Sequence, residues 1–346
     1  MKHKKIIFVG LVGTGQVRIG GETMKNRLMI EHLRKYHYNV CVMDFFEWRK
    51  RPWIILILLL KLLINPRTAL ILSSNAQNIF PIIKVMYFTK SKRAIIFWAV
   101  GGVFHTKVSM GIYKVKYANY ITANIVQSNT MALELKKCGV SNALFVPNSK
   151  PIKYIPQKLS TNCKHIRFVF LSRIVPEKGC NLIIEAVNQL NAAGLIHEYS
   201  VDFYGKIDDV YCKEFTLKLE TLENAIYKSF LNLREKSGYD KLSEYDVMLF
   251  PTYWPGEGFS GVIIDAFIAG LPIIVSDWNH NKEFIKSGET GIVIAPQNVS
   301  ELVTAMRDVI EKKVDIVKMS ENCQVEAMKY DMDNVITKEL LEKIGL

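Results

Sequence analysis

The sequence lacks acidic residues over a long stretch near its start: no Asp or Glu lies between Glu47 and Glu134. Residues 1–150 contain 23 Lys+Arg and 5 Asp+Glu, a net charge of +18, whereas residues 151–346 contain 22 and 28, a net charge of −6. Such an imbalance favours a partner of negative charge, either nucleic acid or a membrane surface. No nucleic-acid recognition motif occurs, so we expect an anionic membrane surface and no nucleic acid.

Long apolar runs are also missing. The run after the basic start has only about five residues, too few for the core of a signal peptide. Residues 53–64 are apolar except for Lys61, but a membrane-spanning helix needs about 20 residues. This segment is either a buried helix or an interfacial helix whose neighbours Arg49, Lys50 and Arg51 meet anionic headgroups. The acid-free surroundings favour the second, so we expect a cytoplasmic protein peripherally associated with the inner face of the cell membrane.

Paired cysteines and metal-binding motifs are absent as well. The six cysteines are scattered without C-x-x-C spacing, and no histidines stand at ligand spacing, which indicates a reducing compartment and argues against a zinc site. Asp331-Met332-Asp333 has the form of a D-x-D metal motif, but it lies among helical residues far from a strand end. We interpret it as surface charge, and no metal is expected.

A complete dinucleotide-binding fingerprint is missing from the first glycine-rich loop. Gly13 and Gly15 would need a third glycine where Arg18 stands, which disfavours a nicotinamide-dependent oxidoreductase. The loop lies between an apolar run at 5–12 and a helical pattern at 22–36, and a second strand pattern follows. This order is typical of a Rossmann-type domain.

Strand and helix patterns alternate through the rest of the chain, as in a doubly wound sheet. A polar segment with two prolines, residues 151–165, interrupts the alternation and is a suitable domain boundary. Further strands are expected at 69–73, 94–100, 121–127, 143–146, 199–206, 225–232, 243–252 and 290–296, and helices around 78–88, 109–117, 129–138, 299–312 and 323–344.

The most informative stretch is PTYWPGEGFSGVIIDAFIAGLPIIVSD, residues 251–277. Ser260 suits the N-cap of an apolar helix that begins at Gly261, and Gly270 suits the left-handed position that ends it. A helix of this length is not stable alone, so it must be buried.

The backbone ahead of this helix can bind an anion. Gly258 and Gly261 allow a ligand to approach closely, and the N–H groups of Phe259 to Val262 lie at the positive end of the helix dipole. Glu257 and Asp265 bracket this site in an E-x7-D pattern. Asp265 has mostly apolar neighbours, and a buried acid needs a partner, so we favour a functional role over two solvated acids.

Two cations follow the strand that begins at Ile166. Arg173 and Lys178, in SRIVPEKG, flank a turn at the carboxyl end of that strand. These residues could simply form a solvent-exposed basic turn, but two cations at this spacing suit the binding of a pyrophosphate.

These motifs resemble those of the retaining glycosyltransferases of family 4, which belong to the glycosyl transferases group 1 and have the GT-B fold. R-x4-K and the later E-x7-D match the family's two hallmarks, although the family usually has E-x7-E. The resemblance implies an α/β protein with two Rossmann-like doubly wound domains facing a central cleft. Residues 1–150 would bind the acceptor at the membrane, 151–165 would be a linker, 166–322 would bind the nucleotide sugar, and a helix at 323–346 would cross back to the first domain.

The resemblance also implies an activity: a retaining, metal-independent glycosyltransferase of the hexosyltransferase type. It would move a sugar from a nucleotide-diphosphate donor to a lipid-linked or other saccharide acceptor in bacterial surface polysaccharide biosynthesis, making capsule, O-antigen or exopolysaccharide. The catalytic residues would be Glu257, Lys178, Arg173 and His105. The donor-binding residues would be Gly20, Gly21, Arg173, Lys178, Glu257, Gly258, Phe259, Ser260, Gly261 and Asp265.

His105 is expected on a loop after the strand at 94–100, where the family often has a histidine that contacts the transferred sugar. In general a single histidine is more often a satisfied loop residue. Two other functions stay open: a GT-B sugar-nucleotide epimerase, which needs no acceptor surface, and a non-catalytic protein that binds a sugar nucleotide or a lipid.

Overall fold

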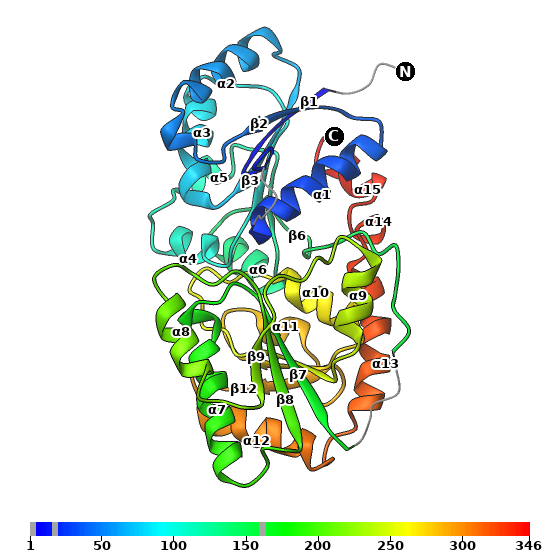
Figure 1. The fold of residues 1–346 in the computed structure, drawn as a ribbon. Helices are drawn as coiled ribbons and strands as arrows, with labels where there is room; N and C mark the ends of the chain where they lie inside the picture. Colours follow the sequence, from blue (N-terminus) through cyan, green and yellow to red (C-terminus); the bar gives the residue numbers. More distant parts are fainter. Residues whose placement is uncertain (1–4, 16–19, 159–163) are drawn as a thin grey trace. The chain divides into compact units, whose positions relative to one another are not determined.

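The computed structural model describes residues 5–15, 20–158 and 164–346 (Figure 1). The chain divides into two compact units, one formed by Met1–Pro151 with Asp331–Leu346 and the other by Ile152–Tyr330. Arg18, which interrupts the glycine fingerprint, and residues 159–163 of the expected linker lie outside the described residues.

The first unit is built on six parallel strands in the order β2-β1-β3-β4-β5-β6. The order reverses between β1 and β3, and ligands of open α/β sheets bind outside the carboxyl ends of strands at such a switch point. The strands are β1 (Lys5–Gly10), β2 (Asn39–Asp44), β3 (Ala69–Ser74), β4 (Ile95–Ala99), β5 (Ala123–Val126) and β6 (Ala143–Phe145).

Helices cover both faces of this sheet, so its strands are apolar on both sides. One face packs against α2 (Trp53–Ile64), α3 (Ala76–Phe88), α4 (Phe104–Ser109), α5 (Val115–Ala118) and α6 (Asn129–Lys137). The other packs against α1 (Gly21–Lys35), α14 (Met332–Val335) and α15 (Lys338–Lys343).

The second unit repeats the plan with six parallel strands in the order β12-β11-β10-β7-β8-β9, reversing between β7 and β10. The strands are β7 (Ile166–Leu171), β8 (Tyr199–Tyr204), β9 (Ala225–Tyr227), β10 (Val247–Phe250), β11 (Ile273–Ser276) and β12 (Gly291–Ile294). The helices are α7 (Cys180–Ala192), α8 (Cys212–Leu219), α9 (Lys236–Ser243), α10 (Gly261–Ile268), α11 (Asn281–Phe284), α12 (Val299–Ile310) and α13 (Ile316–Ala327). The predicted pair of Rossmann-like sheets is confirmed.

The prediction of a single helix at 323–346 is wrong. Helix α13 ends at Ala327 in the second unit, a 3-10 turn follows, and α14 and α15 belong to the first unit. The break has a local cause, because the Asp331 side chain caps the new helix by accepting a hydrogen bond from the Asp333 N–H at 3.3 Å. On the first unit, His32 Nε2 lies 2.8 Å from the Ile336 carbonyl oxygen, and Met332 and Ile336 are 1% exposed.

The helix expected around 109–117 is also displaced. Helix α4 begins at Phe104, so His105 lies in the first turn of a helix rather than on a loop. Packing explains the earlier start: the Phe104 ring lies 5.7 Å from Phe80 and 5.1 Å from Phe97, which fixes this residue in the core.

Helix α2 is not the buried helix that one interpretation of its sequence required. Only Leu58 and Leu62 are buried. On the opposite side Leu56, Leu60 and Leu63 are 64%, 58% and 76% exposed. The exposed large apolar residues of the helix are Trp53, Ile55, Leu56, Ile57, Leu60, Leu63 and Ile64, which we call the α2 surface. Among the described residues, no helix has both the length and the apolar character needed to cross a bilayer.

Candidate functional site

The R-x4-K turn lies at the switch point of the second unit, after β7. Lys178 ends a 3-10 turn, and Gly179, with a φ of 87°, is the N-cap residue of α7. A Cβ at Gly179 would lie 2.4 Å from the carbonyl oxygen of Pro251, so only glycine lets this turn approach the end of β10 so closely. The approach brings Lys178 to the loop that contains Glu257.

Lys178 and Glu257 form a buried ion pair. Their side chains are in direct contact, and the residues are 6% and 7% exposed. The Thr252 hydroxyl donates a 3.0 Å hydrogen bond to the same carboxylate oxygen, Oε2 of Glu257. Burial lowers the pKa of Lys178, and the Glu257 carboxylate opposes that shift. The two predicted charges are therefore brought together and neutralise each other.

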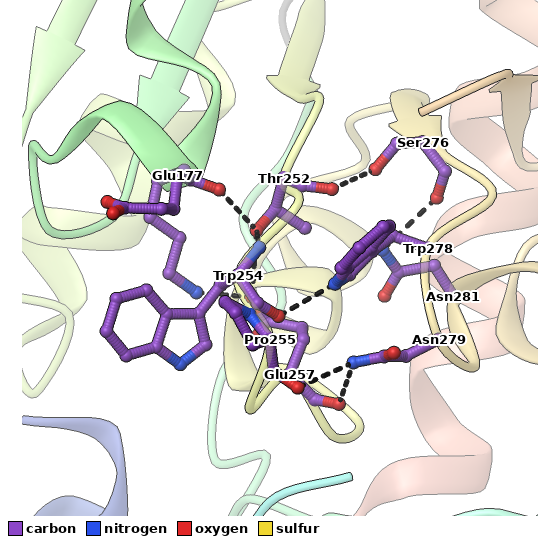
Figure 2. A network of polar contacts seen from close by, with 10 residues as sticks. Glu177, Thr252, Trp254, Pro255, Glu257, Ser276, Trp278, Asn279 and Asn281 are labelled. Atoms are coloured by element: carbon purple, nitrogen blue, oxygen red, sulfur yellow. Dashed lines mark hydrogen bonds and ion pairs between the residues drawn. The ribbon is translucent and has the colours of Figure 1, made fainter. Parts of the chain in front are cut away.

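Figure 2 shows how polar contacts hold the loop after β10, which contains Gly256, Glu257 and Gly258. The Ser276 hydroxyl donates to the Thr252 carbonyl, and Trp278 Nε1 donates to the Trp254 carbonyl at 2.7 Å. Asn279 Nδ2 donates to the Glu257 carbonyl at 2.9 Å. The loop after β11 thus fixes the loop after β10, which positions Glu257. The sequence spacing gave no signal for these three donors.

Arg173 lies against the exposed side of the same loop. Its guanidinium carbon is 4.6 Å from the centre of a Trp254 ring, a cation–π contact. Sequence reasoning named Arg173 but missed Trp254, although this residue stands inside the 251–277 stretch. The contact holds the guanidinium beside the loop without neutralising its charge.

The short helix after the loop is α10, as predicted. Ser260 is its N-cap residue, although its side chain makes no capping hydrogen bond, and Gly270 has the expected left-handed φ of 66°. Phe259 is 3% exposed and stacks on Phe284 with 3.7 Å between ring centres. The Phe259 side chain therefore packs in the core of the second unit. Gly258 and Gly261 lie on either side of it in the sequence.

Asp265 is buried inside α10 and has the partner that a buried acid requires. It is 4% exposed and accepts a 2.7 Å hydrogen bond from the Tyr239 hydroxyl. Burial raises the pKa of Tyr239, and the adjacent carboxylate raises it further. Tyr239 lies on α9, and nothing in the sequence spacing pointed to it.

Three of the predicted site residues belong to the first unit. Gly20 and Gly21 stand at the start of α1, and a Cβ on either would meet no atom of the described residues within 4 Å, so the described part of the fold does not require glycine there. His105 is partly exposed near the carboxyl end of β4, and its Nε2 lies 3.3 Å from the Thr106 hydroxyl.

Two further acids, Asp44 at the end of β2 and Asp333 of the D-x-D sequence, have structural roles. Asp44 accepts hydrogen bonds from the N–H groups of Val12, Gly13, Thr14 and Phe46 at 2.7 to 3.1 Å. Asp333, of the D-x-D sequence, forms an ion pair with Lys35 at 2.6 Å. Among the described residues, no group of three or more His, Cys, Asp or Glu side chains is placed to hold a metal ion.

Comparisons with known proteins match this site to one family. The profile described as "Glycosyl transferases group 1" matches residues 152–329, nearly the whole second unit. A Klebsiella pneumoniae protein, "Uncharacterized 41.2 kDa protein in cps region", is 25% identical over 142 residues, 41% of this chain and 36% of that protein. An Escherichia coli protein, "UDP-Gal:alpha-D-GlcNAc-diphosphoundecaprenol alpha-1,3-galactosyltransferase", is 34% identical over 158 residues, 45% of this chain and 39% of that protein. Each match thus spans less than two thirds of the relative's own length.

A solved structure matches the whole chain. HepE from Anabaena, in complex with UDP and glucose, has a TM-score of 0.73 over 99% of this chain and 100% of that chain, at 15% identity. At this identity the likeness shows the fold, and the expected GT-B fold with its two Rossmann-like domains is confirmed. The family profile covers just over half of the chain. The chain belongs to the glycosyl transferases group 1 family.

Proposed function

We propose that this protein is a retaining, metal-independent glycosyltransferase of family 4 that transfers a sugar from a nucleotide-diphosphate donor to a lipid-linked saccharide in bacterial surface polysaccharide biosynthesis. The main support is the buried contact between Lys178 and Glu257 at the switch point of the second unit, with Arg173 on the same loop. This arrangement fits a nucleotide-diphosphate sugar, because the cations Arg173 and Lys178 can bind the diphosphate and the Glu257 carboxylate can accept hydrogen bonds from the sugar hydroxyls.

In this proposal the side chains of the second unit contact different parts of the donor. Arg173 and Lys178 neutralise charge that builds on the departing diphosphate, which stabilises the transition state. In the ligand-free protein Glu257 holds the Lys178 ammonium in place; on binding, the diphosphate shares this ammonium and Glu257 accepts hydrogen bonds from the sugar hydroxyls. Asp265 binds the ribose, with Tyr239 fixing its carboxylate. In the first unit, His105 contacts the transferred sugar and the backbone at Gly20 and Gly21 faces the donor phosphates.

What is known of the similar proteins supports the class of substrates. The E. coli relative acts on a diphosphoundecaprenol-linked sugar with UDP-Gal, the K. pneumoniae relative is encoded in a cps region, and HepE binds UDP. The acceptor we propose is therefore a saccharide on a lipid diphosphate, and UDP-sugars are the first donors to test.

A thermal-shift screen over UDP-, GDP- and dTDP-sugars tests the donor site, since a ligand that binds only the folded protein stabilises it by mass action. Transfer is then measured with N-acetylglucosaminyl diphosphate carrying a short alkyl chain, and the anomeric configuration of the product is read by NMR. An inverted product would refute retention. Conversion of the donor alone into an epimer would favour the sugar-nucleotide epimerase.

Metal independence is tested separately. Positive charge at the diphosphate comes from Arg173 and Lys178, so transfer should continue in excess EDTA. Complete loss of activity that returns on adding Mg²⁺ or Mn²⁺ would contradict this part of the proposal.

The first unit binds an anionic lipid surface in this proposal. The α2 surface is apolar and exposed, and the acid-free segment around it contains exposed cations at Arg49, Arg67, Lys84, Lys90 and Lys92. Each basic residue near an anionic surface contributes about 1 kcal/mol to binding, and the apolar side chains add a part that salt does not screen.

Two cations of this segment are used inside the unit instead. Arg51 donates to the carbonyl of Phe46, and Arg93 donates to the carbonyl of Leu62 at 2.7 Å near the end of α2. They hold α2 on the unit, so the expectation that Arg51 meets lipid headgroups is not supported by its contacts.

Sedimentation with vesicles tests membrane binding. The protein should pellet with phosphatidylglycerol vesicles, less at 1 M than at 0.1 M NaCl, and only weakly with phosphatidylcholine vesicles. Equal, negligible pelleting with both would refute this part of the proposal while leaving the donor site untouched.

A further inference from the structure

Near the start of α1, the Lys25 ammonium and one oxygen of the Glu22 carboxyl group are buried without a hydrogen-bond partner among the described residues. Glu22 and Lys25 lie in the first two turns of α1, and Lys25 is 8% exposed. Among the described residues, neither Lys25 Nζ nor Glu22 Oε1 has a hydrogen-bond partner, so these two atoms are not bonded to each other. A buried ammonium without a partner costs folding free energy. Proteins keep such local conflicts mainly where function requires them.

The place of these side chains is fixed by the contact between α1 and the sheet. Asn26, next to Lys25, donates to the carbonyls of Leu11 at 3.0 Å and Ser73 at 3.2 Å, and accepts from the Ser73 hydroxyl at 2.6 Å. A Cβ at Gly10 would lie 2.6 Å from the Ser73 carbonyl oxygen, so glycine permits this close approach. The start of α1 is thereby held at the β1–β3 switch point, where open sheets bind ligands.

The surroundings are polar on one side and aromatic on the other. Ser74, the last residue of β3, lies close enough to the Glu22 carboxyl group to oppose the rise of its pKa, and the Lys25 ammonium lies 6.0 Å from the centre of the Trp98 ring. Burial raises the pKa of Glu22 and lowers the pKa of Lys25 to about 7. Both groups are therefore desolvated.

The unsatisfied atoms define the chemistry of a ligand. A hydroxyl group can donate to Glu22 and accept from Lys25 at the same time, and so satisfies both. A phosphate would accept from Lys25 but would be repelled by the Glu22 carboxylate, and an apolar group would satisfy neither. A site that pairs a carboxylate with an ammonium thus favours the hydroxyls of a saccharide.

We propose that Glu22 and Lys25 form the subsite of the first unit that binds a hydroxyl group of the acceptor saccharide. The proposal rests on the transferase function above. It assigns the acceptor rather than the donor diphosphate, because the Glu22 carboxylate would repel a phosphate, whereas the side-chain cations that suit one, Arg173 and Lys178, belong to the second unit. The subsite would select acceptors by the position of one hydroxyl.

Calorimetric titration tests the subsite without requiring turnover. The wild type, Lys25→Met, Glu22→Gln and the control Lys35→Met are titrated with UDP, and then, with UDP present, with N-acetylglucosaminyl diphosphate on a short alkyl chain. Lys35 lies on the last turn of the same helix, and its side chain is 62% exposed. Thermal unfolding of each variant shows whether it is folded.

Lys25→Met and Glu22→Gln should each weaken binding of the acceptor probe at least about tenfold, the scale of losing a hydrogen bond to a charged group. UDP affinity should stay within about twofold in all variants, since the donor contacts proposed for the first unit are made by His105 and by the backbone at Gly20 and Gly21, not by the side chains of Glu22 and Lys25. Lys25→Met should unfold at the same temperature as the wild type or higher, which separates a lost contact from a lost fold.

The experiment distinguishes a failure of the proposed subsite from a failure of the proposed function. If UDP binds and the acceptor probe binds equally, or not at all, to the wild type and Lys25→Met, the subsite is refuted and the donor site stands. If no protein binds UDP or any other nucleotide sugar in the screen, the proposed function is refuted. Weaker UDP binding in Lys25→Met alone would overturn the assignment to the acceptor.

Discussion

The two units share one sheet plan, and each has a lysine and a glutamate at its switch point, but the pairs differ in state. In the second unit Lys178 and Glu257 are in contact and neutralise each other. In the first unit Lys25 and Glu22 are buried near each other without a bond between them. A paired site can be buried with little loss of stability, whereas an unpaired one destabilises the fold until a ligand fills it.

The units also differ in net charge. The first unit, residues 1–151 with 331–346, contains 25 Lys+Arg and 9 Asp+Glu, a net charge of +16, and the second, residues 152–330, contains 20 and 24, a net charge of −4. The cations of the second unit are mostly matched by acids, whereas the segment between Glu47 and Glu134 contains no acid to match its own. Charge of one sign over a whole region affects association more than folding. The comparison therefore separates a unit whose charges nearly balance from one with a large excess of positive charge.

The largest effect is expected from breaking the paired site. Lys178→Ala or Glu257→Ala should lower turnover about a hundredfold or more, because each removes a charge from the donor site. Since both residues are buried, each single change also leaves the other charge unpaired and should lower the free energy of unfolding by about 3–5 kcal/mol. Turnover with the best donor and urea unfolding measure the two effects.

The double variant Lys178→Met/Glu257→Gln is the control for this experiment. It removes both charges and keeps the shapes, so stability should return towards the wild type while turnover stays low. Wild-type turnover in any of these variants would contradict the site assignment. A double variant as unstable as the single ones would show that charge pairing is not what stabilises the loop.

At the unpaired site of the first unit, removing the lysine should raise the free energy of unfolding rather than lower it. Lys25→Met should raise the free energy of unfolding by a few kcal/mol at neutral pH, at about 1.4 kcal/mol per unit of pKa shift as an upper guide. The folded-state pKa of Lys25 is about 7 and its ordinary value is 10.5, so between these pH values the unfolded chain binds more protons than the folded one. The advantage of Lys25→Met should therefore be largest at pH 7 and below and vanish as the pH approaches 10.5.

Urea unfolding of both proteins at pH 6, 8 and 10 checks this. Lys35→Met serves again as the control, because its lysine is exposed and pairs with Asp333. A constant difference between wild type and Lys25→Met across this range would mean that the ammonium of Lys25 is not desolvated.

A smaller effect is expected at the predicted ribose contact. Tyr239→Phe removes the hydroxyl that donates to Asp265 at 2.7 Å, and nucleotide affinity should fall about tenfold, the scale of one hydrogen bond to a charged group. Tyr154→Phe is the matched control, because Tyr154 donates to Asp240 at 2.5 Å elsewhere in the same unit. Titration with UDP should separate them, and equal affinities in both variants would remove Tyr239 from the donor site.

The smallest effect is expected at the α2 surface. Leu60→Ser should weaken binding to phosphatidylglycerol vesicles roughly fivefold, by removing one apolar side chain from the lipid contact. Leu60 is 58% exposed, so thermal stability should not change. Val210→Ser in the second unit, where Val210 is 94% exposed, should leave vesicle binding unchanged. Identical vesicle binding by the two variants would show that the α2 surface does not contact lipid.

Local motifs made the motif-bearing parts of the second unit predictable. The run from Pro251 to Asp277 contains its own strand end, glycine loop, short helix and stop signal, and α10 forms where these signals place it. The same is true of the turn at Lys178, because Gly179 and the following helix lie within a few residues of it. Interactions within a few residues of each other are visible in a sequence.

Contacts between distant segments decided the rest. Tyr239 reaches Asp265 across 26 residues, and Asn279 reaches the Glu257 carbonyl across 22, without any spacing that marks them. The helix expected at 323–346 breaks at Asp331, which lies next to Lys150 in a strand-like bridge. His105 begins a helix because Phe104 packs into the core. Pairings of this kind depend on where the sheet places each element.

By itself the sequence determined the alternation of strands and helices, the two charged motifs of the second unit and the acid-free charge of the first, since each follows from neighbouring residues or from composition. Only the tertiary structure decided that α2 turns most of its apolar side chains outward and that Lys25 Nζ and Glu22 Oε1 are buried without a hydrogen-bond partner among the described residues. An apolar helix reads the same whether it faces a core or solvent. A lysine in the first turns of a helix is ordinarily exposed, and Lys25 is not, because Asn26 and Gly10 pin α1 against the ends of β1 and β3.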